Sequence, residues 1–142
     1  MGSSASVAEL PAWARALLED SRVARLGIAD DEGNPRVLPV TYALCGNAIV
    51  TAIDHKRKSV PVERLARVRW LMARPRAALT VDHYEDDWSR LGWVQAIGPV
   101  TVIADAPKAI AALTERYAPY REQPPAGPVL SLEPDRFLWW RA

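Results

Sequence analysis

The first half of the chain carries apolar residues with the two-residue period of strands that bury one face. Segments 21–29, 35–44 and 48–53 show this pattern and are rich in valine, leucine and isoleucine. Two short polar stretches, 30–34 and 45–47, separate them, and each contains a glycine of the kind that tight turns need. The pattern therefore predicts a three-stranded antiparallel meander.

Helices are predicted where apolar residues recur at helical spacing and prolines or capping residues mark the ends. One is expected over residues 8–20 as a core-packing helix, with Pro11 tolerated in its first turn. A second is expected over residues 60–73, and a third opens at Asp105 as N-cap. The buried stripe of the second is expected to hold Leu65, Val68 and Met72, or a neighbouring set that contains Leu71.

The second half of the chain returns to strand patterns. Segments 76–82, 129–133 and 136–141 predict short strands, and segment 92–103 predicts a long one. The dipeptide Gly98–Pro99 interrupts the long strand, which indicates a bulge or a barrel corner at that point.

The remaining stretches predict little regular structure. Residues 1–6 are small and polar and are expected to fray, and the proline-rich stretch 117–128 is expected to be an irregular crossing loop. Six to seven mostly antiparallel strands with two to three peripheral helices predict an α+β barrel. No repeat or linker divides the chain, so residues 1–142 are expected to form a single domain.

Composition narrows the functional classes. The 142 residues are 49% hydrophobic and 25% charged, as in soluble proteins, and no apolar run is long enough to predict a membrane span. The net charge of +1 gives no general attraction to nucleic acid. The single cysteine, Cys45, excludes an internal disulfide, and no secretory signal pattern precedes it, so a cytoplasmic location is expected.

Positive charge gathers just after the third predicted strand. Lys56, Arg57 and Lys58 follow that strand directly, and the second predicted helix begins within a few residues of them. A helix start beside cationic side chains favours binding of a phosphate or carboxylate. The alternative is a solvated loop that binds nothing. Between residues 56 and 76 the acidic residue Glu63 stands alone against Lys56, Arg57, Lys58, Arg64, Arg67, Arg69, Arg74 and Arg76.

Pro39 lies inside the second predicted strand. Because proline has no N–H for a ladder, the strand is expected to be bulged or to lie at a sheet edge there. Backbone groups of Pro39, Val40 and Thr41 would then be available to a ligand. A plain edge strand is the equal alternative.

Other kinds of site find less support in the sequence. His83 stands near three acidic residues, but no histidine pair or cysteine cluster indicates a metal site, and none is expected. Cys45 lacks basic neighbours, and no glycine-rich phosphate loop is present. The features that remain, a cationic loop beside a proline-broken strand on an apolar barrel, suit a ligand with a flat aromatic head and a phosphate tail.

Four segments together resemble the pyridoxamine 5′-phosphate oxidase-like split-barrel superfamily. They are similar in particular to its probable deazaflavin (coenzyme F420)-dependent oxidoreductases. The segments are residues 22–29, 33–41, 51–58 and 81–91, which include Asp-His-Lys-Arg-Lys and Asp-His-Tyr-Glu-Asp-Asp-Trp. The resemblance implies a split β-barrel that forms a homodimer, with coenzyme F420 or flavin mononucleotide (FMN) bound between subunits.

The resemblance also implies roles for individual residues. Lys56 and Lys58 would hold the cofactor phosphate, assisted by Arg57 or Arg64. Trp88 and Arg90, contributed by either subunit, would close the cleft. The cofactor ring would lie along Pro39, Val40, Thr41, Thr51, Ala52 and Ile53.

The implied activity is hydride transfer to a small organic acceptor, with the cofactor supplying the chemistry. No residue is marked as an acid or base, although Tyr42, His83 and Tyr84 carry suitable groups. A non-catalytic cofactor-binding protein and a dimer without an active site are the alternatives. The chain departs from the family pattern at Trp70 and Arg74.

Overall fold

A computed structural model of the chain describes residues 1–53 and 65–142. These residues form nine strands, four α-helices and two short 3-10 helices. In chain order the elements are β1 (Gly2–Ser4), η1 (Val7–Glu9), α1 (Ala12–Asp20), β2 (Ala24–Ala29), β3 (Pro35–Val40), β4 (Ala43–Cys45), β5 (Ala48–Ala52), α2 (Ala66–Ala73), β6 (Arg76–His83), η3 (Trp88–Arg90), β7 (Gly92–Ile103), α3 (Pro107–Arg116), α4 (Ala118–Glu122), β8 (Val129–Leu132) and β9 (Arg136–Arg141).

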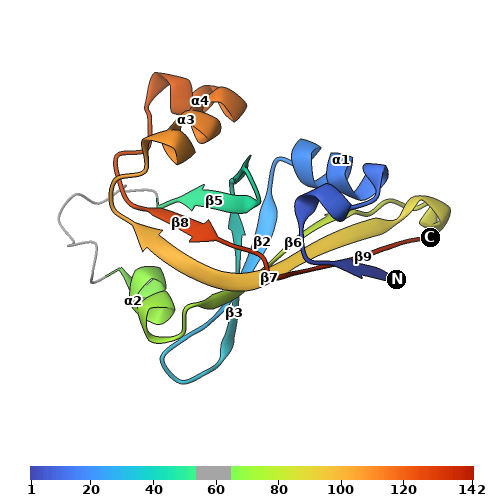
Figure 1. Ribbon diagram of the computed structural model, residues 1–142, viewed down its shortest axis with the longest axis horizontal. Coiled ribbons are helices and arrows are strands. Elements are labelled where there is room, and N and C mark those ends of the chain that lie inside the picture. The colour runs from blue at the N-terminus through green and yellow to red at the C-terminus, as the bar shows by residue number, and fades with distance from the viewer. Residues whose placement is uncertain (54–64) are drawn as a thin grey trace.

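The strands form an open, curved antiparallel sheet of the split-barrel type, so the predicted α+β class is confirmed. The strand order is β3-β2-β6-β7-β8-β5-β4, and β9 adds to β7 and carries β1 on its other edge. Figure 1 shows β7 crossing the whole molecule, with α2 on one side of it and the α3–α4 pair on the other. The predicted meander is thus split, since β3 lies at one end of this order and β4 at the other.

Strand β7 changes partners at the predicted corner. It pairs with β6 over Gly92–Pro99 and then with β8 over Val100–Ile103. The corner prediction is confirmed, although β7 stays one continuous strand. Gly98 has no Cβ, and this lets the carbonyl oxygen of Glu133 approach β7 closely. A Cβ at position 98 would lie 2.3 Å from that oxygen, inside the van der Waals distance. The backbone of the β8–β9 connection therefore closes directly onto β7.

An ion pair lies beside this corner and predicts a dependence of stability on pH. The Arg76 guanidinium donates two hydrogen bonds to Asp135, of 3.0 and 3.2 Å, and they hold the pKa of this carboxyl below its ordinary value. A carboxyl with a lowered folded pKa stabilises the fold above its unfolded pKa of about 3.9, and that contribution is lost as pH falls through the folded pKa. Asp135→Asn is therefore expected to lower the free energy of unfolding at pH 7.

Urea denaturation of Asp135→Asn at a series of pH values measures this effect. The difference from the wild type should shrink as pH falls below about 3.9, where the unfolded carboxyl begins to bind a proton, and should vanish below the lowered folded pKa, where the folded carboxyl is neutral too. Asp86→Asn is the control, because Asp86 is exposed and makes no ion pair with a described residue. A difference that stays constant down to pH 2 would mean that the ionised carboxylate is not the cause.

Three predicted boundaries near the N-terminus are wrong. Residues 1–6 do not fray, because β1 pairs with β9 from Gly2↔Trp139 to Ser4↔Phe137. The first helix does not begin at residue 8, because Pro11 separates η1 from α1 and serves as the N-cap of α1. The strand predicted over 35–44 breaks at Thr41–Tyr42 into β3 and β4.

Two predictions near the C-terminus also need correction. The third helix starts at Pro107 with Ala106 as its N-cap, so Asp105 does not cap it. The stretch 117–128 is not wholly irregular, because Ala118–Glu122 form α4. Tyr117 and Tyr120 meet edge to face, with ring centroids 5.6 Å apart, and pack against the core cluster of α3, β4 and β5. Tertiary packing of the two tyrosines supports a helix of only five residues that propensity alone would not.

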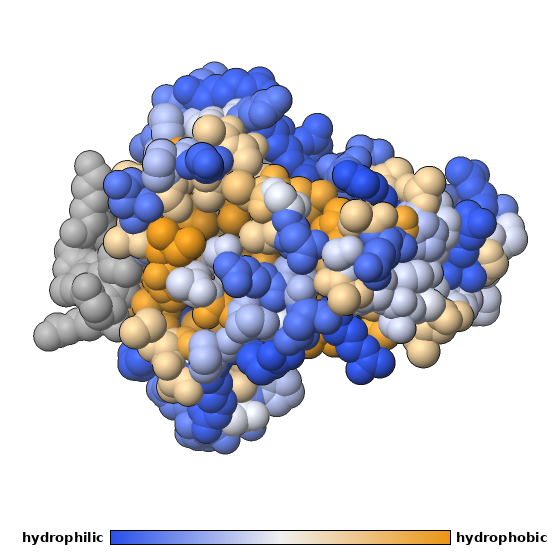
Figure 2. Space-filling model, in the orientation of Figure 1, coloured by the Kyte–Doolittle hydropathy of each residue, from blue (hydrophilic) through white to orange (hydrophobic). Residues whose placement is uncertain are grey.

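The core lies between the sheet and its helices in two clusters. The larger one joins α1, α2 and the inner face of β2, β6 and β7, and the smaller one joins α3 to β4 and β5. Helix α2 buries Val68 and Leu71 while Met72 is 72% exposed, which decides between the two predicted stripes in favour of the one with Leu71. On the face shown in Figure 2, apolar side chains gather between α2 and the α3–α4 pair, over β7 and β8.

Candidate functional site

The break between β3 and β4 opens a slot beside β5. Strand β4 pairs only with Ala48–Val50, so the edge of β5 that faces away from β8 has no strand partner at Thr51–Ile53 among the described residues. Strand β3 ends next to this edge, and Pro39 lies on the outermost strand of the sheet, as predicted. A cavity of about 420 Å³ lies between these chain segments, a size typical of small-molecule sites.

Six residues predicted from the sequence meet in this cavity. Pro39, Val40 and Thr41 come from the end of β3, and the other side is formed by Thr51, Ala52 and Ile53. Val40, Thr51, Ala52 and Ile53 are buried against the core, so their backbone positions are fixed by packing. The structure thus brings the two predicted segments together, and their contact with a cofactor stays a prediction.

The third wall of the cavity is the start of α2. Leu65 has an extended backbone (φ −63°, ψ 128°), and no side chain caps the helix. The first N–H groups of α2 therefore give this wall a positive character. Arg67 lines the same wall, and partial burial lowers the pKa of its guanidinium, which still remains protonated at neutral pH. No ion pair joins Arg67 to residues 1–53 or 65–142.

Two tyrosines fix the remaining side of the cavity. Tyr120 lines it, and its hydroxyl lies 2.7 Å from the Thr41 Oγ1 in a hydrogen bond. The Tyr117 hydroxyl accepts from the Tyr42 N–H at 3.1 Å and lies 3.0 Å from the Tyr42 carbonyl oxygen. These bonds satisfy Tyr42 at the break in the ladder, while no hydrogen bond to a described residue involves the Thr41 backbone. A ligand in the cavity can therefore bond to the Thr41 backbone.

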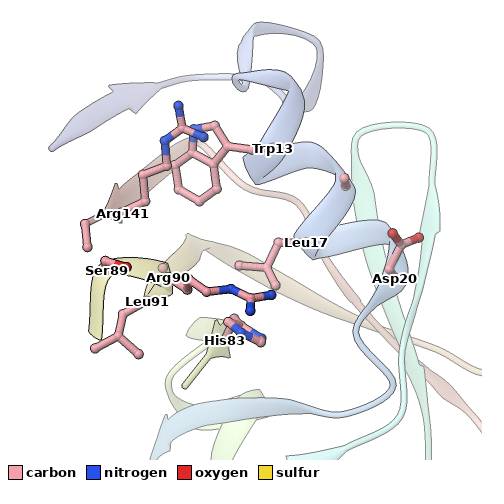
Figure 3. Close-up of a pocket in the computed structure, with 11 residues that line it drawn as sticks. Trp13, Leu17, Asp20, His83, Ser89, Arg90, Leu91 and Arg141 are labelled. Atoms are coloured by element: carbon pink, nitrogen blue, oxygen red, sulfur yellow. The ribbon is translucent and has the colours of Figure 1, made fainter. Parts of the chain in front are cut away.

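The other predicted site residues do not line this cavity in the described part of the chain. Lys56, Arg57, Lys58 and Arg64 lie outside the described residues, so their role stays a prediction. Trp88 is 68% exposed on η3, and Arg90 lines a different cavity, shown in Figure 3. Figure 1 places η3 at the end of the molecule opposite to α2. Neither side chain lines the cavity at α2, so contact of Trp88 and Arg90 with a cofactor stays a prediction.

Sequence reasoning missed Arg67 and Tyr120 as site residues. Arg67 was one of eight cations between residues 56 and 76, with Arg69 among them, and it was not chosen as a site residue although helical spacing places it one turn after the candidate Arg64. The structure separates them, since Arg67 lines the cavity and Arg69 lies 3.2 Å from Asp31 at the surface. Tyr120 fell in a stretch expected to be irregular, and no sequence signal placed it near Thr41.

The groups considered as proton donors lie elsewhere. Tyr42 is fully buried, which raises the pKa of its hydroxyl, and it donates to the Leu18 carbonyl inside the core. His83 contacts Glu85, and Tyr84 is 68% exposed. No group of three or more potential metal ligands occurs in the described parts of the chain. The described walls of the cavity contain no aspartate, glutamate, histidine, lysine or cysteine side chain, so they offer little acid–base chemistry.

Trp70 in α2 and Arg74 at its C-cap, the two residues that depart from the family pattern, both contact the β2–β3 hairpin. The Arg36 guanidinium of β3 lies over the Trp70 ring at 4.7 Å from its centroid, within cation–π range. Arg74 donates a hydrogen bond of 2.8 Å to the Asp30 carbonyl in the β2–β3 turn. Both residues therefore tie α2 to the β2–β3 hairpin, which holds two walls of the cavity in place.

The comparison with family models decides the family. The model described as pyridoxamine 5′-phosphate oxidase matches residues 10–141, nearly the whole chain. The chain belongs to the pyridoxamine 5′-phosphate oxidase family. No curated protein matches the sequence.

Solved structures with a similar fold are named after different ligands. A heme-binding protein from Mycobacterium smegmatis is 23% identical over 89% of this chain and 52% of its own, with a TM-score of 0.71. A FAD-binding protein from Mesorhizobium loti is 20% identical over 92% and 94% of the two chains, with a TM-score of 0.65. An F420 reductase is 18% identical over 91% and 98%, with a TM-score of 0.66.

At these identities the likeness shows the shared fold alone. The chain spans about half the length of the heme-binding protein. None of the helices in the described residues combines the length and apolarity needed to span a membrane.

Proposed function

We propose that this protein is an oxidoreductase that uses coenzyme F420 to transfer a hydride to a small organic acceptor. The observation that carries the proposal is the cavity between β3, β5 and α2, where the predicted ring-binding segments meet a cationic helix start. The family match and the F420 reductase among the similar structures support it. FMN is the alternative cofactor, because the same arrangement of an apolar slot and positive charge suits its phosphate.

The described residues fit such a cofactor in three respects. Val40, Ala52 and Ile53 form an apolar wall that excludes water from a flat ring. The Thr41 backbone would orient the polar edge of the ring, held in place by the Tyr120 hydroxyl. The start of α2 and Arg67 would attract an anionic group of the cofactor. A bound deazaflavin supplies the hydride, so the protein provides position and electrostatics.

Titration with oxidised F420 and with FMN, followed by fluorescence, tests the proposal. Saturable binding of F420 tighter than that of FMN supports the proposed cofactor. Tighter FMN binding, or purified protein that is yellow, would replace it with the flavin alternative. No saturable binding of either would end the cofactor proposal.

The Arg67→Gln variant tests whether the cofactor binds in the cavity at α2 or elsewhere on the surface. A charge-assisted hydrogen bond contributes about 1.5–3 kcal/mol, so the loss should weaken cofactor binding roughly 10- to 150-fold. Arg69→Gln is the matched control, since Arg69 is two residues away on the same helix and lies outside the cavity. Equal affinities for the two variants would show that the cofactor does not bind at the start of α2.

A second candidate is a non-catalytic binding protein. It is favoured by the described walls of the cavity, which contain no aspartate, glutamate, histidine, lysine or cysteine side chain. Supplying the reduced cofactor with quinone, nitroaromatic and enone acceptors distinguishes the two. Oxidation of the cofactor at a rate that depends on the acceptor supports an enzyme. Tight binding with no turnover of the whole panel supports a carrier or storage protein.

The resemblance implies a homodimer, and the positions of two residues support this part of the proposal. Trp88 and Arg90 lie away from the cavity of their own chain, so they would reach a cofactor only across a subunit interface. Sedimentation of the purified protein at several concentrations measures the oligomeric state. A monomer that still binds cofactor with full affinity would remove Trp88 and Arg90 from the site. The cytoplasmic location remains a prediction from the sequence.

A further inference from the structure

The break between β3 and β4 is held by a side-chain hydroxyl from the end of α3. Thr41 and Tyr42 are the two residues of the break, and they belong to neither of the flanking ladders. Buried backbone groups that leave a ladder need other partners. The Tyr117 hydroxyl accepts a hydrogen bond of 3.1 Å from the Tyr42 N–H and lies 3.0 Å from the Tyr42 carbonyl oxygen. Tyr117 thus takes the place of a strand partner at the break.

The same hydroxyl ties the break to the chain just before β2. Its oxygen lies 2.9 Å from the Arg22 carbonyl oxygen. A hydroxyl carries one hydrogen, so this hydrogen is shared between the carbonyls of Arg22 and Tyr42, while the oxygen accepts from the Tyr42 N–H. The last pair of the β2–β3 ladder is Ala24↔Val40. The hydroxyl therefore joins the two strands one step beyond that pair.

The Tyr117 side chain has a fixed position of its own. Tyr117 is the C-cap of α3, and its N–H donates a hydrogen bond of 3.0 Å to the Leu113 carbonyl. Its ring packs against the core cluster of α3, β4 and β5, and the Arg116 guanidinium lies 5.6 Å from the ring centroid. Tyr42 is fully buried on the other side of the bond. A hydroxyl held in this way can set the position of the backbone that it bonds.

The peptide between Thr41 and Tyr42 carries this constraint to the cavity at α2. The described residues contain no cis peptide bond, and in a trans peptide the N–H and the C=O point in opposite directions. Because the Tyr42 N–H points at Tyr117, the Thr41 carbonyl points away from Tyr117. Thr41 lines the cavity, and its carbonyl accepts no hydrogen bond from a described residue. The Tyr120 hydroxyl, 2.7 Å from the Thr41 Oγ1, is a second anchor for this residue.

We propose that Tyr117 is a positioning residue for this cavity, and that it aims the Thr41 carbonyl at an N–H donor on the ring of the bound cofactor. In oxidised F420 and in FMN this donor is the N3–H group, which lies between the two carbonyls of the pyrimidine ring. Tyr117 does not line the cavity, so it acts through the peptide and not by contact with the ligand. The inference rests on the proposed function, because it concerns the same cavity and cofactor.

FO is the probe, because it carries the deazaflavin ring and ribityl chain of F420 without the phosphate. Its N3-methyl derivative, which lacks the N–H donor, is the control ligand. In fluorescence titrations the wild type should bind FO at least about threefold more tightly than the derivative. Tyr117→Phe keeps the ring and removes the hydroxyl, so it should weaken FO binding roughly 3- to 12-fold, the contribution of one hydrogen bond. Binding of the derivative should change by less than about twofold.

Thr114→Val is the matched control variant. It also removes a hydroxyl from α3, but this hydroxyl bonds to the Ile110 and Ala111 carbonyls within the helix and lies outside the cavity. The variant should bind FO and the derivative as the wild type does. Thermal denaturation shows whether each variant is folded. If Tyr117→Phe does not fold, Tyr120→Phe removes the second anchor of Thr41 and should show the same selective loss of FO binding.

Three results would overturn the inference and leave the proposed function in place. One is equal FO affinity of the hydroxyl-deleted variant and the wild type. Another is an equal loss of affinity for FO and for its N3-methyl derivative, because a general loss of structure would then be the cause. The third is binding of F420 without binding of FO, because the ring edge would then contribute nothing. A wild-type protein that binds neither FO, F420 nor FMN would overturn both proposals.

Discussion

Replacing Lys56 and Lys58 together by alanine is expected to weaken cofactor binding by about 2–4 kcal/mol, which is roughly 30- to 700-fold. Both lysines lie outside the described residues, and the expectation comes from the sequence. They come four and six residues after the end of β5, whose last residues line the cavity at α2. Each charge-assisted contact to the cofactor phosphate contributes about 1.5–3 kcal/mol before losses from partial exposure. Fluorescence titration with F420 measures the change.

The control carries the same change in charge at a different place. Lys108→Ala with Arg69→Ala also removes two positive charges, and both residues are exposed and lie outside the cavity. This double variant should bind with nearly wild-type affinity, apart from a small change that salt screens. If both double variants lost affinity equally, the effect would be one of net charge. If neither did, the cofactor phosphate would bind elsewhere.

Gly98→Ala is expected to destabilise the protein by about 3 kcal/mol, near the upper end for an overpacked core position. The added Cβ would lie 2.3 Å from the Glu133 carbonyl oxygen and 2.8 Å from the Pro134 Cα. These are backbone atoms, so no side-chain rotation relieves the clash. For a chain of this size the melting temperature should fall by about 10 °C. Urea denaturation and calorimetry measure both quantities.

Gly27→Ala is the matched control for a glycine inside a strand. Its Cβ would lie 3.6 Å from the Ala78 carbonyl oxygen, an ordinary contact. The substitution should therefore change the free energy of unfolding by less than about 1 kcal/mol. Similar losses for the two variants would show that glycine is needed in these strands for a general reason. A Gly98→Ala protein as stable as the wild type would contradict the tight corner between β7 and the β8–β9 connection.

Local patterns were sufficient for most of the elements. Alternating apolar residues marked β2, β3, β5, β6, β7, β8 and β9, because a strand buried on one face repeats every two residues. Gly33 at φ 82° lies in the predicted turn, and Gly98–Pro99 marks the corner. The elements that the sequence did not predict are those that depend on contacts with residues distant in the sequence. β1 exists because it pairs with β9, and α4 is held by packing of Tyr120 on the core cluster of α3, β4 and β5, so neither segment showed its structure in its own residues.

The candidate site was likewise predicted only in part from the sequence. The sequence alone indicated that the strand carrying Pro39 would be bulged or lie at a sheet edge, because proline removes a ladder donor, and that Thr51–Ile53 would end a β-branched strand. That the strand ends at Val40 is seen only in the structure. Only the tertiary structure decided that these two ends face one cavity. The structure also shows that Arg67 lines the cavity, whereas Arg69 lies at the surface beside Asp31. Residues two positions apart on a helix point to different faces, so only one of these two side chains can face the sheet.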